Sequence, residues 1–422
     1  MKRLIGIGAV WIGCALGWVI LGSTLVVRSG ESSAALSPEV HQLWGPPLEQ
    51  QQPSATYADV TMRRSTRTVT DANGAVSTET SEAPERIDVP VPLVASDLAV
   101  ELALEHRQRG LVWFPTYAVS FQGRYAFTNP DAAAREVTLA FPLQSDHAVY
   151  DGFMVRDAAG EAVEVDIEGG SASWTAQLGP HERASFDVAY RTRGTGTWHY
   201  RMSHGTTRVS DFRLVMTTDF DDVDFPAGTL SPSEHGPTEH GPRGAGWQGT
   251  WRFESLIANQ PIGVEPPARI NPGPLASRIT FFAPVGLLFF FFVVAVLGGA
   301  QRRELHPMHF FFLGCSFFAF HLLFAYLVDH LSIIPSFALS AGVSIFLVIS
   351  YARLFVGWRF ALCEVGISQL IYLVLFSATF LLEGFTGLAI TALAILTLFV
   401  MMQITGRRRG APETPASAPQ VF

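Results

Sequence analysis

The apolar residues of this chain follow two different patterns along its length. Near both ends they form blocks of about 20 residues with almost no charge, whereas the long middle segment alternates between apolar and polar positions in short runs. About 20 apolar residues are needed for a helix to cross the ~30 Å hydrocarbon core of a membrane. Six blocks reach this length, at residues 4–27, 279–299, 309–328, 333–352, 360–382 and 385–404. The pattern therefore predicts one membrane helix before the middle segment and five after it.

The positions of the basic residues favour one orientation of these helices. Short cytoplasmic loops carry an excess of Lys and Arg. With the N-terminus inside, the basic residues at the two ends and in the short loops fall on the cytoplasmic side: Lys2, Arg3, Arg302, Arg303, Arg353, Arg359 and Arg407–Arg409. The two short outer turns, at Asp329-His330 and Glu383-Gly384, contain no Lys or Arg. We expect both termini in the cytoplasm and residues 29–278 on the other side of the membrane.

The first apolar block has a second interpretation. Lys2 and Arg3 resemble the charged start of a secretory signal peptide, and Ser32–Ala35 resembles its cleavage site. The apolar run is longer than the usual 7–15 residues of such a peptide. We therefore expect an uncleaved signal anchor over residues 1–28.

The middle segment, residues 29–278, has the pattern of a β domain. We expect residues 29–58 to form an extended lead-in with one short element, because Pro38, Pro46, Pro47 and Pro53 interrupt them. From residue 60 onward short strands with turn residues between them predict antiparallel sheets in one or two layers. Asp71–Gly74 is typical of a hairpin turn, and we expect the last strand to be Trp247–Ile257.

The predicted fold class is thus a membrane α+β protein. It has one N-terminal transmembrane helix, a large antiparallel β-sandwich-like domain and a C-terminal five-helix transmembrane bundle. We expect four parts along the chain: the signal anchor, residues 1–28; the β domain, residues 29–278; the helix bundle, residues 279–405; and a disordered cytoplasmic tail, residues 406–422. The Pro- and Ala-rich composition of the tail is the reason for the last of these.

Composition excludes several classes of function. Residues 29–278 hold 19 arginines against 32 Asp or Glu, a net charge of −13, which fits poorly with nucleic acid as a partner. Cys14, Cys315 and Cys363 all lie in apolar blocks, so the middle domain has no disulfide. The only lysine is Lys2, which excludes a Walker A loop and the Ser-x-x-Lys set of serine β-lactamases. No catalytic residue, cofactor or metal site is assigned.

Two segments of the middle domain invite a metal site and have a simpler explanation. The acidic run Asp219–Asp224 could supply oxygen ligands to Ca²⁺, but it lacks the spacing of an EF-hand and is expected to be a solvated loop. The repeat Glu234–Arg243 contains His235 and His240, which could bind Zn²⁺. We expect it instead to be a Gly-Pro loop insertion.

Polar residues inside the apolar blocks are candidates for function because burying them in lipid is costly. His321 and Glu364 are the strongest of these. For Glu364 we expect an ion pair with Arg359, Arg353 or Arg303, and for His321 a hydrogen bond across the bundle as a neutral imidazole. Use of both residues in a transport pathway is the alternative.

The loop between the second and third blocks carries a motif. It reads Arg-Glu-Leu-His-Pro-Met, over Arg303–Met308, after a further basic residue, Arg302. His306-Pro307 fits a helix start, since proline is favoured in the first turn. This motif, the one-plus-five helix layout, Gly45-Pro46 and the late tryptophans Trp247 and Trp251 resemble the CreD family of bacterial inner-membrane proteins. The layout covers the whole chain, although Trp44–Pro47 departs from the family pattern.

The resemblance implies a protein of the inner membrane with residues 29–278 in the periplasm. It also implies a link to envelope integrity and to the response to β-lactams or colicins, and it supplies no catalytic residues. Our first hypothesis is a non-enzymatic protein whose partners are the lipid bilayer and an envelope component bound by the β domain. A transporter or flippase-like bundle is the alternative, and a periplasmic metal-dependent enzyme is the second alternative.

Overall fold

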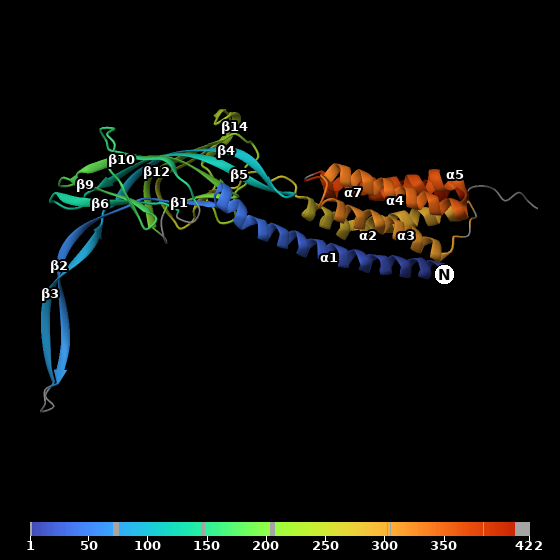
Figure 1. The fold of residues 1–422 in the computed structure, drawn as a ribbon, viewed down its shortest axis with the longest axis horizontal. Helices are drawn as coiled ribbons and strands as arrows, with labels where there is room; N and C mark the ends of the chain where they lie inside the picture. The colour runs from blue at the N-terminus through green and yellow to red at the C-terminus, as the bar shows by residue number, and fades with distance from the viewer. Residues whose placement is uncertain are drawn as a thin grey trace, which may run out of the picture. The chain divides into compact units, whose positions relative to one another are not determined.

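A computed structural model gives the fold of the 422-residue chain (Figure 1). The structure describes residues 2–70, 76–144, 148–202, 207–301, 303, 305–382 and 384–409. The chain forms two compact units. The helical unit comprises Met1–Ala35, Gly110–Val112 and Ile270–Phe422, and the β unit comprises Leu36–Arg109 and Trp113–Arg269.

Six helices in the described residues are long and apolar enough to cross a membrane. This confirms the six apolar blocks as helices by length and composition. Five are α1 (Lys2–Trp44), α2 (Pro272–Ala300), α3 (Pro307–Leu327), α4 (Ile333–Val356) and α8 (Thr386–Arg409). The sixth runs from Trp358 to Leu381 through α5 (Trp358–Phe360), η1 (Ala361–Gly366), α6 (Ile367–Gln369), η2 (Leu370–Leu375), α7 (Phe376–Ala378) and η3 (Thr379–Leu381), of which η1 and η2 are π-helical.

Aromatic side chains form much of the core of the helical unit. Trp18 is fully buried and its ring contacts Phe317 and Phe318 of α3. Close approach of α1 to its neighbours requires glycine, because a Cβ on Gly22 would lie 2.9 Å from the Phe281 ring. Between helices in lipid, such rings stabilise the unit by van der Waals packing rather than by leaving water.

The expectation of an extended lead-in was wrong for residues 29–44. Helix α1 continues through them to Trp44 with Pro38 inside it. Proline cannot donate the backbone hydrogen bond of an ordinary helical residue, and tertiary contacts compensate for this loss. Val40 is fully buried, and Glu39 forms an ion pair with Arg109 at 2.8 Å. Tertiary contacts thus override the local preference against a helix.

The β unit holds three sheets. The first has the order β1-β11-β15, the second β13-β14-β12-β4-β5-β10-β7, and the third β3-β2-β6-β9-β8. Their strands are β1 (Leu48–Gln51), β2 (Ser54–Thr70), β3 (Val76–Pro90), β4 (Leu93–Arg109), β5 (Val112–Thr128), β6 (Arg135–Pro142), β7 (Asp151–Arg156), β8 (Asp166–Glu168), β9 (Ser171–Leu178), β10 (Arg183–Thr195), β11 (Trp198–Arg201), β12 (Thr207–Thr218), β13 (Glu234–Gly241), β14 (Gly244–Ala258) and β15 (Ile262–Val264).

Three sequence-based expectations for these sheets need correction. The sheets are not wholly antiparallel, since β12 pairs with β4 and β1 pairs with β11 in parallel. The last strand is β15 rather than β14. The repeat expected to be a loop insertion forms β13, an edge strand, where Pro237 is tolerated because an edge position needs fewer backbone donors.

The core of the β unit lies between the seven-stranded sheet and the two smaller ones. Phe121 of β5 packs against Phe141 of β6, with ring centroids 6.2 Å apart, and Tyr200 of β11 packs against Phe212 of β12 at 5.8 Å. Strand β4 shows the alternation that produces this core, since Leu98, Val100 and Leu102 are buried and the residues between them are not. The opposite face of the seven-stranded sheet therefore carries the other set of side chains.

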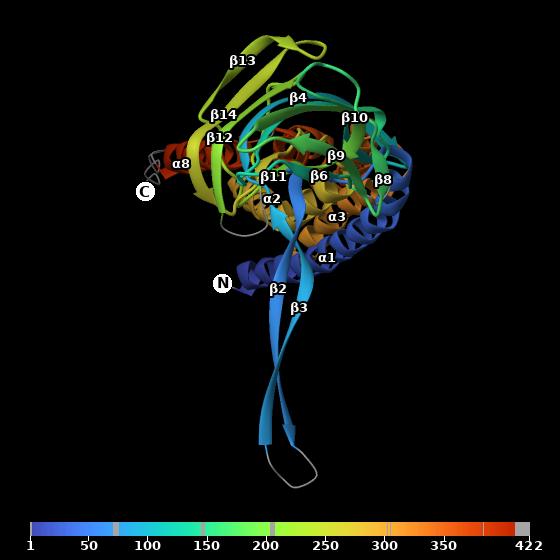
Figure 2. The same cartoon turned by 90° about the vertical axis from the view of Figure 1, so that its left-hand side faces the viewer.

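Strands β2 and β3 continue beyond the third sheet as a two-stranded ribbon (Figure 2). β2 pairs with β6 only over Ser54–Tyr57, whereas it pairs with β3 from Thr56 to Thr70. This confirms the predicted hairpin, whose strand β3 lies at the edge of its sheet; the turn residues, 71–75, lie outside the described residues.

The first sheet is tied together by an ion pair between neighbouring parallel strands. Arg201 of β11 donates to both carboxylate oxygens of Glu49 of β1, at 2.7 and 2.8 Å. The hydrogen bonds from Arg201 hold the pKa of Glu49 below its usual range. A carboxyl whose pKa is lower in the folded than in the unfolded protein stabilises the fold above the unfolded pKa, and this contribution is lost as the pH falls through the folded pKa.

We therefore expect the β unit to lose thermal stability as the pH falls from about 5 to about 3, and Glu49→Gln to make this loss shallower. Thermal unfolding of the purified chain across this range measures it. Glu164→Gln is the control, because Glu164 is exposed. If the melting temperature of Glu49→Gln fell with pH as steeply as that of the native chain, the Glu49–Arg201 ion pair would not contribute to the pH dependence of stability.

Candidate functional site

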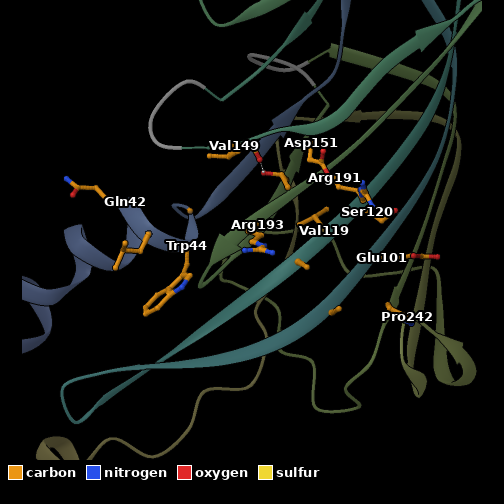
Figure 3. A pocket seen from close by; sticks show the side chains of 15 residues that line it. Gln42, Trp44, Glu101, Val119, Ser120, Val149, Asp151, Arg191, Arg193 and Pro242 are labelled. Carbon is orange, nitrogen blue, oxygen red and sulfur yellow. Dashed lines mark hydrogen bonds and ion pairs between the residues drawn. The ribbon is translucent and has the colours of Figure 1, made fainter. Parts of the chain in front are cut away.

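A hollow of about 450 Å³ lies on the outer face of the seven-stranded sheet (Figure 3). Strands β4, β5 and β10 form its floor, where small residues such as Ala103, Ala118 and Ser120 leave space above the backbone. The last turn of α1, with Gln42 and Trp44, forms a wall. The volume is within the range of small-ligand sites in proteins.

The register of the strands sets the positions of the side chains at this floor. Arg191 of β10 lies opposite Ser120 of β5, and Arg193 lies opposite Ala118. Residues two apart on one strand point to the same face of a sheet. The two arginines therefore face the hollow together, as Figure 3 shows.

The charged groups around the hollow differ in how they are compensated. Arg191 donates to Asp151 of β7 at 2.7 Å, so these two charges are paired. Arg193 and Glu101 are both exposed, and within the described part of the chain neither has an ion-pair partner. The hollow thus offers one positive and one negative group to a ligand.

The wall carrying Trp44 is held by a tight junction between the end of α1 and β10. Gly45 follows the helix with φ +98°, a conformation that favours glycine, and its N–H donates to His41 O at 3.0 Å. A Cβ on Gly45 would lie 2.1 Å from the carbonyl oxygen of Arg193. Thr195 Oγ1 donates to Gly45 O at 2.9 Å, which fixes the chain on β10.

A second cavity, of about 880 Å³, lies beside the hollow along the same face of the sheet. Ser120 and Arg191 line both. Exposed ion pairs run along the second cavity, with Arg124–Asp187 at 2.7 Å and Arg213–Asp97 at 3.2 Å. Such pairs each contribute only about 0–1 kcal/mol to stability.

The residues proposed from sequence lie in the helical unit. Arg302 and Glu304 are outside the described residues. The expected ion pair of Glu364 with an arginine was wrong: within the described residues its Oε1 accepts a hydrogen bond from Gln301 Nε2 at 2.9 Å, and its Oε2 is buried without a partner. Arg303 is linked to Glu364 through Gln301, because Arg303 Nε donates to Gln301 Oε1 at 3.4 Å. Arg303 Nη1 also donates to the carbonyl oxygen of Val356.

His306, Pro307 and Met308 begin α3. The His306 side chain accepts a hydrogen bond from the Met308 N–H at 3.4 Å and so caps the helix, and Pro307 occupies the first turn. Pro307 also lies close to α1, because a Cβ on Gly6 would come within 2.9 Å of its ring. The geometry gives these residues a local structural role.

His321 does not bond across the bundle as expected. It is almost fully buried, and its Nδ1 lies 3.1 Å from the carbonyl oxygen of Phe317, one turn earlier on the same helix. A histidine in a helix can bond to the i−4 carbonyl in this way. The ring packs against Trp18 and Phe320, at 5.5 and 4.9 Å. Glu364 shares none of these contacts, so the structure does not bring the two residues together.

The candidate metal segments do not converge. Across the described ranges, no group of three or more His, Cys, Asp or Glu is placed to hold a metal ion. The Asp219 carboxylate already takes part in a hydrogen bond, because its Oδ1 accepts one from the Leu104 N–H at 2.8 Å. The acidic run is a loop after β12, and His235 and His240 lie on the edge strand β13.

Sequence reasoning missed Trp44, Glu101 and Arg193. Alternation along a strand indicates that Arg191 and Arg193 share a face, which was a usable signal. The strand order that places β4 and β10 on either side of β5 was not predictable from alternation. The position of Trp44 also depends on where α1 ends, and Pro38 had led us to expect no helix at residues 29–44.

Comparisons with known proteins identify no relative that informs this site. No family model matches the chain, and no curated protein matches it. A solved structure from Legionella pneumophila, described as a candidate nutrient-binding protein, is similar over 60% of this chain and 97% of that chain, with 10% identity and a TM-score of 0.30. A likeness this weak carries no argument about fold or function.

We expect Gly45→Ala to destabilise the β unit more than Gly160→Ala. Both glycines have positive φ, but only Gly45 has an atom against its Cβ position. The conformational strain costs about 1–3 kcal/mol in each case, and the contact with Arg193 O adds to it at Gly45. Melting temperatures of the two purified variants test this. Equal losses would mean that the junction tolerates a side chain.

Proposed function

We propose that this is a non-enzymatic protein of the bacterial inner membrane that supports envelope integrity or the response to envelope stress. Residues 29–278, which include the β unit, face the periplasm, and the β unit binds an envelope partner. Both termini lie in the cytoplasm. The distribution of arginines between the apolar blocks supports this orientation, and the resemblance of the Arg303–Met308 loop to the CreD family supports the link to the envelope.

The hollow on the seven-stranded sheet is the observation that carries the binding proposal. It combines an aromatic wall, Trp44, with two charged groups, Arg193 and Glu101, that lack ion-pair partners within the described residues. Concave sites with a few convergent polar groups are where proteins usually bind ligands.

In-cell photo-crosslinking tests the proposal. A photoreactive amino acid at Gln42, which lines the hollow and is exposed, should capture a recurrent partner. The same amino acid at Glu164, which is exposed and away from the hollow, should not capture that partner. If the partner were captured equally from both positions, or from Glu164 alone, the hollow would not be its binding site.

A transporter-like bundle is the second candidate, supported by a buried chain of hydrogen bonds. Gln369 Nε2 donates to Ser344 Oγ at 2.7 Å, and Ser344 Oγ donates to Ser316 O at 2.6 Å. Gln369 Oε1 is buried and has no partner within the described residues. Gln369 also lies between the two π-helical segments η1 and η2, and such segments occur frequently at functional sites.

A variant that removes the charge of Glu364 distinguishes the binding proposal from the transporter-like bundle. Under the binding proposal, Glu364→Gln leaves the envelope-stress phenotype intact at normal protein levels, because an amide can also accept the hydrogen bond from Gln301. The phenotype is measured as growth of a deletion strain complemented with each variant under envelope stress. Loss of complementation by Glu364→Gln, with Gln403→Ala on the exposed face of α8 as a normal control, would favour the transporter.

A further inference from the structure

Two charged residues of the hollow that lack an ion-pair partner within the described residues lie on different strands of its floor. Arg193 is on β10 and Glu101 is on β4, and β5 lies between these strands. Between the two charged residues the floor carries Ala103, Ala118 and Ser120, whose side chains are too short to fill the space. Figure 3 shows Arg193 beside Trp44, with Glu101 at the far side of the hollow.

The spacing of the strands gives the separation of the backbones that carry the two charged residues. Neighbouring strands are about 4.8 Å apart, so the two backbones are separated by about 10 Å. An extended peptide spans about 3.4 Å per residue. A chain of about three residues therefore matches this separation.

We propose that the hollow binds a short peptide with free ends, with its carboxylate on Arg193 and its ammonium group on Glu101. The peptide lies across β5, over the small residues of the floor, and its side chains contact Trp44 and Val149. This assignment rests on the proposed binding function and specifies the ligand class.

The other charged groups at the hollow favour the same orientation. Arg191 and Asp151 are paired with each other at 2.7 Å, which leaves Arg193 and Glu101 as the charged groups of the hollow that have no ion-pair partner within the described residues. A guanidinium group binds a carboxylate through two parallel hydrogen bonds, which makes Arg193 the specific end of the site. An anion without an ammonium group would leave Glu101 unused and would gain only part of the binding energy.

Calorimetry on the full-length chain in detergent tests the proposal with tri-alanine as the probe. Tri-alanine should bind, and either N-acetylation or C-amidation should weaken its binding by about tenfold or more, because each removes a charge-assisted hydrogen bond. In Arg193→Gln, amidation should lose its effect while acetylation keeps it. In Glu101→Gln, acetylation should lose its effect while amidation keeps it.

Arg183→Gln is the matched control. Arg183 is an exposed arginine on the same strand and face as Arg193 but lies outside the hollow, so this variant should bind as the native chain does. Equal binding of tri-alanine and its doubly blocked derivative, or no binding of either, would overturn the peptide assignment. If crosslinking from Gln42 still captured a partner in that case, the proposed function would stand and only the ligand class would fail.

Discussion

The β unit depends on one junction, the contact between the end of α1 and strand β10. Gly45 turns the chain at φ +98° directly against the carbonyl oxygen of Arg193, and Thr195 donates to the Gly45 carbonyl oxygen at 2.9 Å. Any side chain at position 45 would separate the two segments. From this point the chain enters β1, whose Leu48 N–H donates to Thr197 O at 3.2 Å. The junction therefore positions Trp44 on the outer face of one sheet and begins the next sheet on the inner side.

This arrangement explains why the outer face of the seven-stranded sheet differs from the inner face. Aromatic residues such as Phe121 and Tyr190 stack at 4.8 Å on the inner side, where they exclude water. On the outer side small residues and exposed charges predominate, and the end of α1 covers part of the face. A surface of this kind contributes little to stability, which supports the proposal that it serves binding.

Much of the fold was predictable, because two physical constraints act on the sequence directly. A membrane-length helix needs a long apolar block, and a half-buried strand needs alternation, so the six helices and strands such as β4 follow from local pattern. The extension of α1 past Pro38 did not follow, since it depends on the burial of Val40 and the contact of Glu39 with Arg109. The parallel pairing of β12 with β4 also depends on contacts between distant segments.

The site was less predictable than the fold for the same reason. Sequence drew attention to His321 and Glu364 because polar residues in apolar blocks are conspicuous, yet the structure gives them separate local partners, Phe317 and Gln301. Glu101 and Arg193 are ordinary charged residues of exposed strand faces. Only the strand order shows that they share one hollow.

The most direct test of the central claim is the reactivity of Ser120→Cys, in the floor of the hollow, with a membrane-impermeant maleimide. The native cysteines are first replaced by serine, and Glu164→Cys provides an exposed reference. Our account predicts that both cysteines react in the purified protein, whereas in intact cells Glu164→Cys reacts and Ser120→Cys is protected by the bound partner. Equal reaction of both positions in cells would contradict occupancy of the hollow, and absence of reaction at both would contradict a periplasmic β domain.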